Sequence, residues 1–116
     1  MRFLIVEDDE SLRERLGRAL RDRGHFATTA ASGAAARKVG AEGFDAAVVD
    51  VRLGAESGLD LIQDLLAIQP LARIVVVTGE MNPRVARDAA FVGAATWLSK
   101  PFDADEVLAA VKATGG

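Results

Sequence analysis

The sequence contains no cysteine, which excludes disulfides, thiolate catalysis and zinc sites built on thiolates. No apolar run approaches the roughly 18–20 residues that a membrane-spanning helix needs. The apolar opening turns acidic at Glu7, too early for a signal peptide. Acids and bases are scattered, the net charge is −3, and there is no basic patch to bind nucleic acid. These absences predict a soluble cytoplasmic protein that by itself binds neither membranes nor nucleic acid.

The 116 residues, 50% of them apolar, suit one domain with a single core over 1–116. Short apolar, β-branched runs alternate with amphipathic segments, and no linker or low-complexity block interrupts them. The runs predicted to form strands are 3–6, 26–30, 46–49, 74–77 and 95–98. The threonine-rich run 26–30 suits a sheet edge, whereas the nearly all-apolar runs suit central strands buried on both faces.

Amphipathic segments with capping signals lie between these runs. Four helices are predicted to begin at residue pairs that can cap or start a helix: Ser11 with Glu14, Ser57 with Asp60, Asn82 with Pro83, and Asp103 with Glu106. A further helix of small residues is predicted over 33–39, and Gly24 and Gly93 are placed to end the first and the fourth helix. Strictly alternating strands and helices predict an α/β fold, a doubly wound five-stranded parallel sheet with right-handed crossovers.

Ligands of such sheets bind beyond the carboxyl ends of the strands, so the residues that follow each buried run are candidates for function. They are Glu7, Asp8 and Asp9 after the first run, Asp50 after the third, Thr78 after the fourth and Lys100 after the fifth. Crowded carboxylates repel one another, and an ammonium group with a hard divalent cation such as Mg²⁺ would neutralise them. Such a site suits phosphoryl transfer onto an aspartate.

Each of these residues, taken alone, has an ordinary structural explanation. Asp9 and Thr78 could cap the helices that follow them, Asp50 could be a solvated turn residue, and Lys100 could be a surface lysine. Coincidence is the weaker explanation, because four predicted strand ends carry the whole set in the right order.

At these positions the sequence resembles the receiver domains of bacterial response regulators, the chemotaxis regulator among them. The resemblance covers residues 2–113, and its matching stretches are 4–9 (LIVEDD), 48–53 (VVDVRL), Gly58, 76–79 (VVTG) and 98–102 (LSKPF). The segments after Asp50 and before Pro101 also resemble a redox-responsive regulator subgroup of proteobacteria. The resemblance implies a flavodoxin-like sheet with the strand order 2-1-3-4-5.

The resemblance also implies a role for each acid of the set. Asp50 would be the phosphorylated residue and would also be a ligand of the metal ion. Asp8 would bind Mg²⁺ directly and Glu7 through a bound water, and the main-chain carbonyl of Arg52 would be a further ligand.

The remaining positions would respond to the phosphoryl group. Lys100 would pair with Asp50 and then with the phosphoryl oxygens, aimed into the site by a cis peptide before Pro101. Thr78 would turn inward to hydrogen-bond the new phosphate and tip the domain to its active form. The switch position three residues before the lysine is usually Tyr, Phe or His in the family. Here it holds Trp97, whose larger indole either couples to Thr78 or simply packs on the surface.

Two further features bear on the surroundings of the acceptor. Gly54 stands four residues after Asp50, where the family commonly has a proline, and this predicts a looser loop. Arg52 and Glu80 follow Asp50 and Thr78 by two residues each, on adjacent loops. They either pair above the acceptor and restrict hydrolytic water, modulating the phosphoryl lifetime, or are two unrelated solvated side chains.

Three other functions compete with this one. A haloacid-dehalogenase-type phosphatase needs a second acid two residues after its nucleophile, where this chain has Arg52. A nucleotide- or flavin-binding module needs a glycine-rich phosphate cradle, which does not follow the first predicted strand, and failure to bind these ligands would exclude it. A degenerate receiver would keep the fold without the chemistry. The sequence gives this alternative little support, because every acid, threonine and lysine position of the site is filled.

His25, the single histidine, follows Gly24 away from the strand ends and is predicted to be a surface turn residue. The donor phosphohistidine must therefore belong to a partner, either a sensor histidine kinase or a histidine phosphotransfer protein. We expect no enzyme activity beyond the domain's own phosphorylation and dephosphorylation. The chain is expected either to act alone on an effector protein or to be the receiver part of a longer transcriptional regulator with an output domain, and phosphorylation could produce a homodimer.

Overall fold

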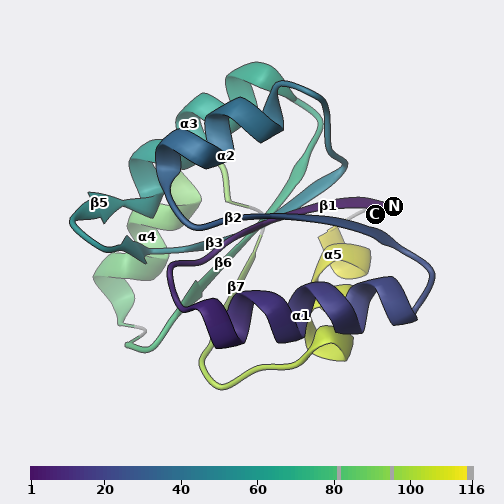
Figure 1. Ribbon diagram of the computed structural model, residues 1–116. Coiled ribbons are helices and arrows are strands. Elements are labelled where there is room, and N and C mark those ends of the chain that lie inside the picture. The colour runs from purple at the N-terminus through teal and green to yellow at the C-terminus, as the bar shows by residue number, and fades with distance from the viewer. Residues whose placement is uncertain (81, 95, 115–116) are drawn as a thin grey trace.

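The structure, a computed structural model, describes residues 1–80, 82–94 and 96–114. Five parallel strands form one sheet in the order β2-β1-β3-β6-β7, which confirms the predicted doubly wound fold and its strand order (Figure 1). These strands are β1 (Arg2–Val6), β2 (Phe26–Ala30), β3 (Ala46–Asp50), β6 (Arg73–Thr78) and β7 (Thr96–Ser99). The helices are α1 (Glu10–Asp22), α2 (Gly33–Gly40), α3 (Gly58–Ile68), α4 (Pro83–Phe91) and α5 (Ala104–Thr114). The last predicted strand opened at Ala95, which lies outside the described residues.

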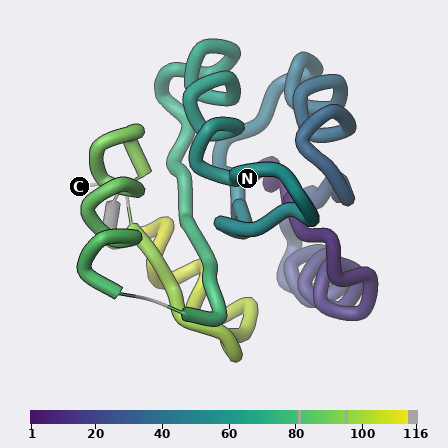
Figure 2. Tube along the Cα trace, turned by 90° about the vertical axis from the view of Figure 1, so that its left-hand side faces the viewer, coloured from purple at the N-terminus to yellow at the C-terminus, as the bar shows by residue number. Residues whose placement is uncertain are grey.

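The sheet separates two apolar clusters, because alternate residues of a buried strand face opposite sides. Leu4 and Val6 of β1 belong to the cluster that includes residues of α2 and α3, whereas Phe3 and Ile5 pack with residues of α1 and α5. The view in Figure 2 likewise shows α1 and α5 together on one side and α2 and α3 on the other. Strand β2 is only partly buried and lies at the sheet edge, as its composition predicted.

A short antiparallel hairpin that the sequence did not predict follows β3. Its strands are β4 (Arg52–Leu53) and β5 (Glu56–Ser57), and Gly54 in the turn between them has a φ of 60°. Glycine adopts this left-handed conformation readily, whereas proline is locked at a φ near −65°. Leu53 is buried in the cluster on the α2 side and anchors the hairpin to the core. The segment for which a looser loop was predicted forms the turn and the second strand of this hairpin.

Three helix starts lie where the sequence predicted them. The side chain of Asn82 caps α4 by accepting the N–H of Val85 at 3.0 Å. Asp103 and Glu106 exchange hydrogen bonds between side chain and backbone at the start of α5, which is the predicted capping box. Ser57 precedes α3 as predicted, but its side chain makes no capping hydrogen bond to the described residues.

The predicted cap of the first helix is wrong. Helix α1 begins at Glu10, and Asp9 caps it by accepting the N–H of Leu12 at 3.1 Å. Asp9 has the extended backbone of a cap residue, with a φ of −74° and a ψ of 109°, so Ser11 falls inside the first turn. The predicted pairing of Ser11 with Glu14 therefore has no role at the helix start.

The predicted helix stops follow α1 and α4. Gly24 and Gly93 have φ values of 87° and 100°, the left-handed conformation typical of a residue that ends a helix. Among the described residues, no helix is both long enough and apolar enough to cross a membrane.

Candidate functional site

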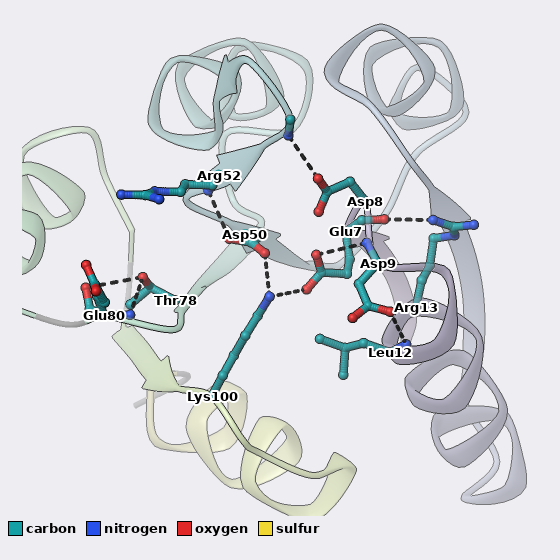
Figure 3. A network of polar contacts seen from close by, with 11 residues as sticks. Glu7, Asp8, Asp9, Leu12, Arg13, Asp50, Arg52, Thr78, Glu80 and Lys100 are labelled. Atoms are coloured by element: carbon teal, nitrogen blue, oxygen red, sulfur yellow. Dashed lines mark hydrogen bonds and ion pairs between the residues drawn. The ribbon is translucent and has the colours of Figure 1, made fainter.

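Three carboxylates from two neighbouring strands meet at the carboxyl edge of the sheet (Figure 3). Glu7 follows β1 and Asp50 ends β3, and these residues are only 2% and 5% exposed, whereas Asp8 is exposed. Because β1 and β3 pair in parallel, both strands end at the same edge. One carboxylate oxygen of each residue lies within 4.8 Å of the others. This group of oxygens can hold a divalent metal ion.

Lys100, directly after β7, faces two of these carboxylates (Figure 3). Its Nζ atom lies 2.6 Å from Asp50 Oδ2 and 2.7 Å from Glu7 Oε1. Its backbone N–H donates to the carbonyl oxygen of Thr78 at 2.8 Å, which fixes Lys100 beside the end of β6. The peptide bond between Lys100 and Pro101 is cis. The structure thus places Lys100 against Asp50, as the resemblance implied.

Burial and mutual contact shift the pKa values within this group. Removal from water raises the pKa of Glu7 from 4.5 to about 7, and the neighbouring Asp50 adds to the rise. Burial alone lowers the pKa of Lys100, but its hydrogen bonds to Asp50 and Glu7 outweigh this effect and raise the pKa above its ordinary value. Near neutral pH, Lys100 is therefore charged, and Glu7 is protonated in part of the molecules.

The raised pKa of Glu7 predicts that the metal-free protein loses stability as the pH rises. The folded state binds a proton at Glu7 more tightly than the unfolded state does, so this contribution is fully present below pH 4.5 and is lost as the pH passes about 7. Urea unfolding in EDTA across this range measures this contribution, and Glu7→Gln should lose that part of the pH dependence. Identical pH dependence in both proteins would contradict the prediction.

The hairpin supplies two backbone donors to the carboxylates. The N–H of Arg52 donates to Asp50 Oδ1 at 2.9 Å, and the N–H of Gly54 donates to Asp8 Oδ2 at 3.0 Å. A hydrogen bond to an ionised carboxylate is stronger than one between neutral groups, so these contacts orient both side chains. Proline at position 54, common in the family, would have no N–H to offer Asp8.

A cavity of about 510 Å³ opens beside Asp50, lined by residues that follow the ends of β1, β3, β6 and β7. Thr78 lines it and is 7% exposed. Its hydroxyl accepts the N–H of Glu80 at 3.2 Å and donates to the Glu80 carbonyl at 3.3 Å. Within the described part of the chain, no ion pair joins Arg52 to Glu80, although both line the cavity.

Sequence reasoning missed three residues of the site. The guanidinium of Arg13 donates to the carbonyl oxygen of Glu7 at 2.9 Å, which ties α1 to the end of β1. Asn82, considered only as the start of a helix, and Val85, which the sequence did not single out, also line the cavity. Arg13 gave no signal in the sequence because α1 carries several arginines, and only the packing of the helix shows which of them points at the site.

Three residues singled out in the sequence contribute no side chain to the carboxylate cluster. The side chain of Asp9 caps α1, and only its backbone N–H reaches the cluster, donating to Glu7 Oε2 at 3.3 Å. Trp97 on β7 is 44% exposed. His25 was predicted to lie at the surface, but it is half-buried because the turn after α1 folds its ring edge-on against Phe3, with 5.4 Å between ring centroids.

Comparison with known proteins agrees with this geometry. The family model of the response regulator receiver domain matches residues 3–112. The chain belongs to this family. The receiver domain is 43% identical to the photosynthetic apparatus regulatory protein RegA of Rhodovulum sulfidophilum over 97% of its own length. It is 40% identical to the acid tolerance regulatory protein ActR of Sinorhizobium medicae over 94%. It spans 62% and 57% of the lengths of these two relatives.

Solved receiver structures have the same fold. A response regulator of Burkholderia pseudomallei, solved with a phosphorylated aspartic acid, a calcium ion and citrate, superposes with a TM-score of 0.91 at 37% identity. That comparison covers 95% of the receiver domain and 65% of the solved chain. The chemotaxis protein CheY4 of Vibrio cholerae gives a TM-score of 0.91 at 27% identity and covers 97% of both chains. Both the fold and the family predicted from the sequence are therefore confirmed.

Proposed function

We propose that this receiver domain, over residues 1–116, accepts a phosphoryl group on Asp50 in a Mg²⁺-dependent reaction. The observation that carries the proposal is the carboxylate of Asp50, which opens on the cavity and is held by Lys100 on one oxygen and by the N–H of Arg52 on the other. The donor is a phosphohistidine of a sensor histidine kinase or a histidine phosphotransfer protein. In the transfer, a carboxylate oxygen of Asp50 forms a bond to phosphorus, the phosphorus–nitrogen bond breaks, and the imidazole leaves.

The residues present fit a hard divalent cation. The cluster offers only oxygen ligands, and the buried Glu7 Oε1 has no hydrogen bond of good geometry among the described residues, only its ion pair with Lys100. Asp8 and Asp50 would hold Mg²⁺ through their carboxylates, Glu7 through a water molecule, and Arg52 through its carbonyl. Bound there, Mg²⁺ supplies positive charge to the oxygens of the transferring group.

The other residues act on the phosphoryl group once it is transferred. Lys100 moves its contact from the carboxylate to a phosphoryl oxygen, and Thr78 exchanges its contact with the backbone of Glu80 for one with another phosphoryl oxygen. Water then attacks phosphorus, the bond to Asp50 oxygen breaks, and inorganic phosphate leaves. The domain catalyses no other reaction.

The movement of Thr78 is proposed to reach Trp97 on the adjacent strand β7 and so to change the surface formed by α4, β7 and α5. That surface would switch contacts with an effector protein, an output domain or a second copy of the domain. Because its donors are proteins of this signalling system, we propose that the domain works in the cytoplasm. Nucleic acid and membrane are not proposed as its direct partners.

The test is the intact mass of the protein after incubation with acetyl phosphate and Mg²⁺, followed by mapping of the modified peptide. One added phosphoryl group on Asp50, absent when EDTA replaces Mg²⁺, is the expected result. No adduct in the presence of Mg²⁺, together with no binding of beryllofluoride, would leave a degenerate receiver as the better conclusion.

Arg52 and Glu80 are proposed to restrict the approach of water to the acyl phosphate, each by covering part of the cavity. Arg52→Ala and Glu80→Ala are each expected to shorten the phosphoryl half-life by up to about fivefold, equivalent to ~1 kcal/mol for exposed charged side chains. Decay of the phosphorylated protein, followed by intact mass, measures this. Lys38→Ala, an exposed change on α2, is the control. Unchanged decay in both variants would contradict the proposal.

A further inference from the structure

The hairpin β4–β5 contacts the carboxylate cluster at one end and helix α2 at the other. At the near end, the N–H groups of Arg52 and Gly54 donate to Asp50 and Asp8. Figure 1 shows the hairpin and the start of α2 at the same edge of the sheet, where the strands end. The hairpin therefore lies between the proposed metal site and the first turn of α2.

At the far end, Glu56 reaches the start of α2. Its Oε1 accepts the backbone N–H of Gly33 at 3.1 Å, a contact that spans 23 residues of sequence and is partly buried. The first N–H groups of a helix have no partner within the helix, and a carboxylate there is also favoured by the helix dipole. Ser32 satisfies the N–H of Ala35 in the same turn, so Glu56 fills a position that the local sequence leaves open.

Gly33 leaves room for the Glu56 carboxylate, and any larger residue there would displace it. A Cβ atom at Gly33 would overlap the Glu56 carboxylate and would lie 2.9 Å from a guanidinium nitrogen of Arg37. Arg37 in turn donates to Asp64 on α3 at 2.7 Å and lies 3.9 Å from Glu56. Glu56 thus contacts a pair of helices that are tied to each other, and it adds a second attachment to a hairpin that Leu53 anchors to the core.

We propose that Glu56 is a positioning residue for the metal site. By anchoring the hairpin on α2, it holds the backbone of Arg52 and Gly54 against Asp50 and Asp8, and so keeps these two carboxylates oriented for a divalent ion. The inference rests on the Mg²⁺ site of the proposed function. Coupling between two sites is reciprocal. The factor by which the contact between Glu56 and Gly33 raises the Mg²⁺ affinity is therefore also the factor by which bound Mg²⁺ raises the equilibrium constant for forming that contact.

The experiment measures Mg²⁺ affinity by isothermal titration calorimetry on the full 116-residue chain, with the metal as the only ligand. Glu56→Ala is expected to weaken Mg²⁺ binding by about three- to tenfold. This is below the effect that is usual for a residue that hydrogen-bonds directly to a metal-binding side chain. Gly33→Ala, which displaces the Glu56 side chain without removing it, should weaken binding to a similar extent. Glu56→Gln retains an oxygen that accepts the Gly33 N–H and should bind within about twofold of the unaltered protein. Glu42→Ala, another exposed glutamate, is the matched control.

A second readout separates positioning from general loosening of the fold. Saturating Mg²⁺ should slow hydrogen exchange of the Gly33 amide in the unaltered protein and should have no such effect in Glu56→Ala. Equal affinity in all variants, or a loss in Glu56→Gln as large as that in Glu56→Ala, would overturn the inference and leave the proposed function standing. Absence of Mg²⁺ binding in the unaltered protein would overturn the metal site and this inference together.

Discussion

Asp50→Asn is expected to abolish phosphoryl uptake from acetyl phosphate while the domain still folds. The amide matches the carboxylate in shape, but it is a poor nucleophile and carries no charge to pair with Lys100, which lies 2.6 Å from the native oxygen. The fold should persist because β3 is wholly buried by apolar neighbours on both faces, and the substitution removes one of three crowded carboxylates.

Asp45→Asn is the matched control for this experiment. Asp45 directly precedes β3 and contacts Arg2 through a backbone hydrogen bond of 2.7 Å and a side-chain ion pair of 3.5 Å. It lies at the opposite end of the strand from Asp50, so its variant should take up one phosphoryl group at the rate of the unaltered protein. Intact mass measures both variants. A full adduct in Asp50→Asn would contradict the assignment of the acceptor, and the exposed Asp8 would be the first residue to map.

The second large effect is expected for Gly58→Ala. Gly58 opens α3, its N–H donates to the carbonyl of Val51 at 2.8 Å, and a Cβ atom there would overlap the carbonyl oxygen of Asp50. Because Asp50 ends a central strand paired on both sides, its backbone cannot move without breaking the sheet. We expect a loss of about 3 kcal/mol or more in the free energy of unfolding.

Urea denaturation of Gly58→Ala, with Gly79→Ala as control, measures this effect. A Cβ atom at Gly79 meets nothing within 4 Å, and the φ of Gly79 is not positive, so its variant should stay within about 0.5 kcal/mol of the unaltered protein. Failure of Gly58→Ala to give a folded baseline agrees with the prediction. An unfolding midpoint equal to that of Gly79→Ala would contradict it.

The sequence predicted the members of the site because parallel strands end at one edge. Glu7 and Asp50 each stand where a buried apolar run stops, and Lys100 follows the last run, so strand prediction alone brought them together. The same logic could not predict which of the two acids after Glu7 places its carboxylate in the site. Asp9 follows the same strand, but its side chain caps α1. This role depends on the residue at which the helix begins, which the sequence predicts only to within a few residues.

The short hairpin and the contacts between segments distant in sequence could not be predicted. The strands of the hairpin have two residues each, too short for any periodicity to show, and the conformation of Gly54 decides the turn. The contact of Glu56 with Gly33 depends on the packing of that hairpin against α2, and nothing local to either residue indicates it. In the same way, Trp97 could be placed on its strand, but its exposure follows from which helices cover β7.

Lys100, which bridges Glu7 and Asp50, also sets the balance of charge at this edge of the sheet. When every group is ionised, the carboxylates of Glu7, Asp8 and Asp50 together with one ammonium leave two negative charges uncompensated. A single divalent ion brings that total to zero, whereas a monovalent ion leaves it negative. With all four groups ionised, an anionic phosphodonor approaches an electrically neutral centre when one divalent ion is bound, and the lysine makes that single ion sufficient.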